Sequence, residues 1–113
     1  MSYFFSDQEN LQYKNEGYLV RENQFSFREI KKFRKAFEST VSKALEISSS
    51  GKEYFLDKKR FVDIDYLTLQ YEPEPNDSSL KVIEPAHALN PDLDNIISDQ
   101  RLTDPIKSIL SIN

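Results

Sequence analysis

The 113-residue sequence contains no cysteine, no tryptophan, two glycines and a single histidine, His87. The absence of cysteine excludes a disulfide scaffold, a thiol nucleophile and a zinc–cysteine site. One histidine cannot supply the two imidazoles of a 2-His-1-carboxylate iron site. Two isolated glycines cannot build a phosphate-binding loop, and no Gly-x-Ser-x-Gly elbow indicates a serine hydrolase. These 113 residues therefore do not hold the usual signatures of several enzyme classes.

The sequence also lacks a run of about 18 apolar residues and an apolar leader preceded by basic residues. We therefore expect a cytoplasmic protein that has no membrane partner. The net charge of −4 argues against a nucleic-acid partner, because neutralising phosphates requires clustered positive charge. With 38% hydrophobic and 30% charged residues, the composition is typical of a folded chain, and we expect one domain over residues 1–113.

The first predicted helix begins at a capping box formed by Ser6 and Glu9, in which each residue bonds the other's backbone amide. It should run from Asp7 to about Asn15 and end at Gly17, a residue suited to a left-handed cap. The apolar stretch that follows, residues 18–22 (YLVRE), predicts a short strand.

A second capping box, Ser26 and Glu29, precedes apolar residues that recur at steps of three and four. This spacing predicts an amphipathic helix of about five turns that ends before Gly51. The face expected to be buried carries Phe27, Ile30, Phe33, Phe37, Val41 and Leu45.

Strands are predicted in the middle of the chain. Apolar residues in 62–71 fall on both faces, which indicates a strand covered on two sides or a strand with a bend near Tyr66. The turn EPEPND leads to a returning antiparallel strand at 80–84. Asn90-Pro91 and Asp104-Pro105 each predict a helix start, because each pairs an N-cap residue with proline. The predicted fold class is α+β.

Four isolated residues could form small-molecule or metal sites. His87, beside a helix start, is more typical of structural hydrogen bonding than of metal binding. Lys81 lies on a short apolar strand and could hold an anionic small molecule, or could simply face solvent. Asp63 and Asp65 share one side of the predicted strand and could bind a cation, although a polar strand face is the more common interpretation.

A basic stripe follows the long predicted helix. Its members are Arg28, Lys31, Lys32 and Lys35, and the sequence DKKR at residues 57–60 is expected to join them. Such a stripe suits an anionic partner. The phenylalanines of this helix belong to its opposite, buried face, so a solvated surface is the plainer interpretation.

Two long stretches resemble the phytanoyl-CoA dioxygenase family. EGYLVRENQFSFREIKKFRKAFES resembles its opening, where a Gly-aromatic-Leu-Val segment precedes a helix entered through an acidic capping box. LQYEPEPNDSSLKVIEPAHALNPDLDNIISDQRLTDPIKSIL resembles the next block, in which a hairpin, a lysine- or arginine-bearing strand, a histidine and Asn/Asp-Pro lead into short helices. The resemblance covers about residues 16–110.

The resemblance implies an Fe(II)- and 2-oxoglutarate-dependent oxygenase, which hydroxylates an unactivated C–H bond of a small-molecule substrate and releases succinate and carbon dioxide. It also implies that these helices and short antiparallel strands flank a double-stranded β-helix core of the jelly-roll, cupin-like type. Lys81 matches a position from which some members reach 2-oxoglutarate. His87 matches a recurrent histidine outside the metal motif, with a structural or metal-supporting role.

The sequence departs from the family where iron would bind. The family uses a His-x-Asp pair, a later histidine and a cosubstrate-binding arginine, whereas His87 is followed by Ala88 and Leu89. We therefore expect the N-terminal portion only, with the catalytic core elsewhere in the reading frame or in another chain. Alone it should be inactive and should not stably bind Fe(II) or 2-oxoglutarate. The alternative is a small non-catalytic α+β binding module that uses the basic stripe.

Overall fold

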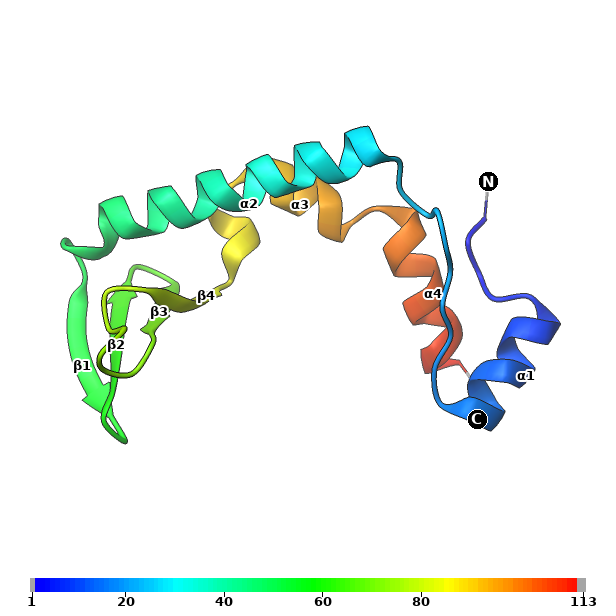
Figure 1. Cartoon of the computed structure of the whole chain (residues 1–113), viewed down its shortest axis with the longest axis horizontal. Helices are drawn as coiled ribbons and strands as arrows, with labels where there is room; N and C mark the ends of the chain where they lie inside the picture. Colours follow the sequence, from blue (N-terminus) through cyan, green and yellow to red (C-terminus); the bar gives the residue numbers. More distant parts are fainter. Residues whose placement is uncertain (1, 112–113) are drawn as a thin grey trace.

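The computed structural model describes residues 2–111, which form an arch (Figure 1). The long helix α2 (Phe27–Ser48) is its top, a four-stranded sheet lies below one end, and helices α1 (Asp7–Glu16) and α4 (Gln100–Leu110) lie at the other. The Cα radius of gyration is 18.0 Å, whereas a compact domain of this length would have about 13 Å. The α+β class is confirmed, but the described residues do not close around one core.

Both predicted capping boxes are confirmed. Ser6 and Ser26 each accept a hydrogen bond from the backbone N–H of the glutamate three residues later, and that glutamate accepts from the serine N–H. Helix α1 ends at Gly17, whose φ of 80° is left-handed. The predicted strand at 18–22 is wrong. Arg21 there binds the carbonyls of Tyr3 and Phe4 through its side chain, and the segment has no strand beside it within residues 2–111.

The buried side of α2 differs from the predicted one. The buried residues of α2 form a row of small side chains spaced four apart: Ala36, Thr40, Ala44 and Ser48. Small side chains let the sheet and the short helices approach α2 closely. The predicted face lies partly beside this row, and most of its large side chains are exposed: Phe27, Ile30, Phe37, Val41 and Leu45.

The sheet is an antiparallel meander in the order β1-β2-β3-β4. Its strands are β1 (Lys52–Leu56), β2 (Lys59–Ile64), β3 (Leu67–Tyr71) and β4 (Leu80–Glu84). The predicted bend near Tyr66 is the β2–β3 turn, and the predicted pairing with 80–84 is the β3–β4 ladder. Strand β1 was not predicted. It joins β2 through Asp57 and Lys58, both with positive φ, as two-residue hairpin turns require.

The largest buried cluster lies where α2 meets the sheet. Ala44 packs there with Val62, Leu69 and Tyr71, and the phenol of Tyr71 is hydrogen-bonded to the hydroxyl of Ser48. Gly51, just after the helix, has no room for a side chain, because a Cβ would lie 2.8 Å from the carbonyl oxygen of Asp63. The turn from α2 into β1 therefore depends on glycine.

The last third of the chain contains the short helix η1 (Ala86–Leu89), then α3 (Pro91–Ile97) and α4. Asn90 caps α3 as predicted. The helix start predicted at Asp104-Pro105 is wrong, because Asp99 caps α4 and Pro105 lies inside it. Asp104 instead accepts a hydrogen bond from the backbone N–H of Tyr3. No helix within residues 2–111 is both long and apolar enough to cross a membrane.

Candidate functional site

Helix α2 carries an apolar surface and a basic surface that bear on function, and two sets of contacts hold the neighbouring helices α3 and α4 against it. The first is centred on Arg101, at the start of α4. Its guanidinium donates to Glu29 and to Asp99, each across 2.7 Å, and lies 4.3 Å from the ring centre of Phe25. The Arg101 hydrogen bonds lower the pKa of Asp99. The pKa of Glu29 is lowered first by the Ser26 amide and then by Arg101. The ion pairs hold the beginnings of α2 and α4 together.

The second contact is made by Asn90. Its side-chain amide donates to the carbonyl of Ala36 across 3.2 Å and lies 3.3 Å from the hydroxyl of Thr40. Its side-chain oxygen accepts from the N–H of Asp92, which caps α3. Asn90 therefore holds α3 along one flank of α2. On the same flank the ammonium of Lys43 donates to the carbonyl of Leu89, across 3.5 Å.

A cleft of about 240 Å³ lies between α2, α3 and the start of α4. The side chains that line it include four acids or amides and two cations: Glu29, Asp92, Asn95, Asp99, Lys32 and Arg101. Arg101 already forms ion pairs with two of these carboxylates, Glu29 and Asp99. The cleft is best explained as the seam between packed helices.

The opposite flank of α2 carries an apolar stripe, defined here as Ile30, Phe37, Val41 and Leu45. Each of these residues is between 41% and 51% exposed. Their helical spacing places them on the side away from Lys32 and Lys43, which face α3 and η1. Contiguous exposed apolar side chains usually mark a surface that binds another polypeptide.

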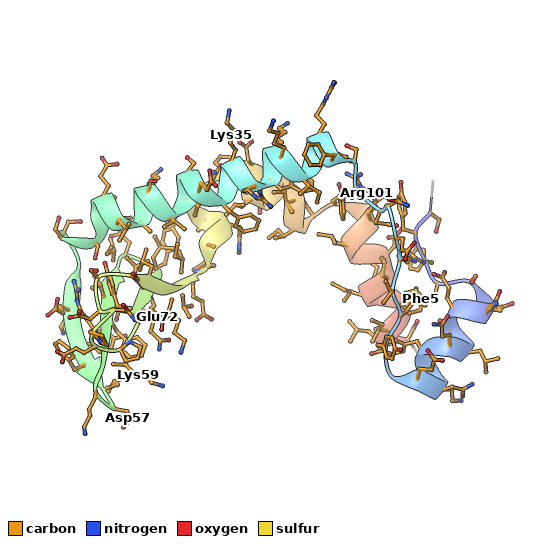
Figure 2. The ribbon with its side chains drawn as sticks, in the orientation of Figure 1. Phe5, Lys35, Asp57, Lys59, Glu72 and Arg101 are labelled. Atoms are coloured by element: carbon orange, nitrogen blue, oxygen red, sulfur yellow. The ribbon has the colours of Figure 1, made fainter. Side chains whose placement is uncertain are left out.

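A basic face covers the outer side of α2 near its N-terminus. It consists of Arg28, Lys31, Lys32, Arg34 and Lys35, all exposed, with an open space of about 620 Å³ between their side chains. The predicted continuation through DKKR is not formed. Lys35 projects from the outer side of α2, whereas Lys59 lies at the lower end of the sheet (Figure 2). Arg60 lies 4.1 Å from the ring centre of Tyr71 and binds Glu53.

Lys81 and His87 lie on the β4–η1 stretch. Lys81 is exposed in β4. His87 is exposed in η1, and its carbonyl accepts from the N–H of Asn90 across 3.4 Å. Within residues 2–111 neither side chain makes a hydrogen bond or an ion pair that would place it in a shared site. The 2-oxoglutarate role of Lys81 and the supporting role of His87 stay predictions.

The acidic residues do not form a metal centre in the part of the chain that the structure describes. Asp63 accepts hydrogen bonds from the hydroxyls of Tyr54 and Thr68, across 3.1 and 2.9 Å. Asp65 lies in the next turn with a φ of 53°, so it does not share a strand face with Asp63. No three His, Cys, Asp or Glu side chains are grouped to bind an ion among residues 2–111. These residues therefore do not fit the family's iron centre.

Sequence reasoning missed the two residues that organise α2. Asn90 was recognised as a helix cap, but its bonds to Ala36 and Thr40 depend on packing between distant segments. Arg101 carried no local signal beyond its position near Asp99.

Comparisons with models of protein families, with curated proteins and with solved structures each found no match.

Proposed function

We propose that this chain is the N-terminal, non-catalytic portion of an Fe(II)- and 2-oxoglutarate-dependent oxygenase of the phytanoyl-CoA dioxygenase family. In this proposal the chain supports a jelly-roll core that carries the His-x-Asp pair, the later histidine and the substrate pocket. The resemblance over residues 16–110 supports the proposal, because it follows the order of helix, strands, histidine and short helices.

The observation that carries the supporting role is the apolar stripe of α2. Four large side chains remain about half exposed on a helix that already packs through a separate row of small residues. Burying the exposed half of each would contribute on the order of 1 kcal/mol per side chain. The stripe is therefore a suitable docking surface for the core, which would also cover the open side of the arch.

The described residues supply no iron site, so the metal chemistry is assigned to the core. Lys81 is proposed to reach the 2-oxoglutarate from β4, and His87 to support the turn into α3. The alternative, a self-sufficient binding module, receives less support from an open arch with large apolar side chains exposed.

The test begins with the reading frames around this one. We expect one of them, or a continuation of the same frame, to encode His-x-Asp followed by a second histidine. That polypeptide should co-purify with the tagged 113-residue chain. Replacing two stripe residues, Phe37→Asp with Val41→Asp, should abolish co-purification.

A matched control places the same two charges elsewhere on α2. Ser39→Asp with Ser42→Asp changes exposed residues on the other side of the helix, and co-purification should persist. Equal recovery of the core by both double variants would contradict docking through the stripe. The absence of any neighbouring frame with these metal ligands would contradict the family assignment.

A further inference from the structure

We propose that the basic face of α2 is a docking surface for a short acidic segment of another protein, rich in aspartate and glutamate. The face is the set Arg28, Lys31, Lys32, Arg34 and Lys35 defined above. All five side chains are exposed, so a partner could reach them without displacing a packed element, although Lys32 also lines the cleft beside α3.

The charge on this face is concentrated, and none of its five cations forms an ion pair within residues 2–111. Residues 28–35 contain five cations and one acid, Glu29, whose carboxylate binds Arg101 and the Ser26 amide. The four ion pairs found within residues 2–111 use Arg21, Arg60 and Arg101 as cations and none of the basic face. The five side chains therefore keep their full charge for a partner.

The distribution of charge favours a short segment over an extended anionic surface. Outside residues 28–35 the chain has ten cations and eighteen acids. A bilayer or a nucleic-acid duplex would bring its negative charge against this acidic remainder as well as against the basic face. At physiological ionic strength charges act over about 8 Å, so a segment confined to the face avoids most of that repulsion.

The shape of the basic face also favours a short linear acidic segment. All five cations come from one helix and span roughly 10–12 Å along its axis, at a rise of about 1.5 Å per residue. The open space between their side chains, about 620 Å³, also borders Glu38. A linear peptide can lie across this face with carboxylates against successive cations. Arg34 borders the apolar stripe, because it lies four residues after Ile30 and three before Phe37, but Lys31 and Lys35 lie on a different side of α2. The proposed binding therefore does not depend on the docking of the core.

The experiment measures binding of a labelled octaglutamate peptide to the full 113-residue chain by fluorescence anisotropy. We expect saturable binding at low salt that weakens by at least about tenfold when the salt is raised from roughly 20 to 200 mM. Lys31→Glu with Lys35→Glu should weaken binding at low salt by about tenfold or more. The control, Lys58→Glu with Lys59→Glu, makes the same charge change on the β1–β2 hairpin and should leave binding within about twofold.

Circular dichroism establishes that each variant is folded, and Lys31→Gln with Lys35→Gln provides a milder second variant that should also weaken binding. Parallel titrations use phosphatidylserine vesicles and a single-stranded DNA octamer. The proposal is overturned by absent octaglutamate binding at low salt, by equal losses in both charge-reversal variants, or by tighter binding of the vesicles or the DNA than of the peptide.

Discussion

The guanidinium of Arg101 donates to the carboxylate of Glu29, 72 residues earlier in the chain, across 2.7 Å and so joins the first turns of α2 and α4. The same carboxylate accepts from the Ser26 N–H and so closes the capping box of α2. One acidic group therefore starts the long helix and fixes α4 against it. A similar double use occurs at Glu9, which caps α1 and binds Arg21.

Stability should fall in acid because of these carboxylates. The hydrogen bond from Arg21 is the main reason that the pKa of Glu9 is lowered from 4.5 to about 2, and the pKa values of Glu29 and Asp99 are also lowered. A carboxylate with a lowered pKa stabilises the folded state above its unfolded pKa, and that contribution is lost as the pH falls through the folded pKa. The thermal midpoint should therefore decline from about pH 5 to pH 2.

The pH dependence can be assigned by substitution. Glu9→Gln should lower the midpoint near neutral pH and reduce its decline in acid, whereas Glu22→Gln, at an exposed position, should change neither. Thermal unfolding followed by circular dichroism across this pH range measures both effects. An unchanged acid decline in Glu9→Gln would show that Glu9 is not one of the responsible groups.

Asn90 should be one of the most sensitive surface-accessible positions. Asn90→Ala removes the cap of α3 and the bonds to Ala36 and Thr40, so we expect a loss of roughly 2 kcal/mol of unfolding free energy. Asn95→Ala, at an exposed position in α3, should cost less than about 0.5 kcal/mol. Urea denaturation compares the two. Similar costs would mean that Asn90 does not join α3 to α2.

The apolar stripe should contribute little to the stability of the isolated chain. Phe37 is half exposed, so Phe37→Ala should cost no more than about 1 kcal/mol. Leu69 is fully buried in the sheet, and Leu69→Ala should cost about 2–5 kcal/mol. Denaturation of the purified variants measures the difference. A cost for Phe37→Ala near the 3–5 kcal/mol of a buried phenylalanine would show that the stripe is covered within the chain itself.

The elements recognised from sequence are those whose signals are local. The capping boxes at Ser6 and Ser26 and the Asn90 cap each involve residues within one turn of helix, and all three are confirmed. The start predicted at Asp104 failed because Asp99, also a suitable cap, lies one turn earlier. Asp104 was then free to accept from Tyr3, a contact that no local pattern records.

The sequence did not predict which side of α2 is buried. A hydrophobic side chain does not show whether the segment that would cover it belongs to the same chain. The periodic phenylalanines and leucines correctly marked one helix, but the described chain packs against Ala36, Thr40 and Ala44. Small residues carry little hydrophobic signal, although they permit close approach. Four of the five residues of the basic face, all but Arg34, were identified from the sequence. The predicted extension through residues 57–60 lies on the sheet, away from Lys35 (Figure 2).

The most direct test of the supporting role is 2-oxoglutarate turnover, measured as oxygen consumption with carbon dioxide release in the presence of Fe(II). The purified 113-residue chain should show none, and turnover should appear in the complex with the polypeptide that carries the His-x-Asp pair. Turnover by the 113-residue chain alone would contradict the proposal, because it would require an iron centre within a chain that has one histidine.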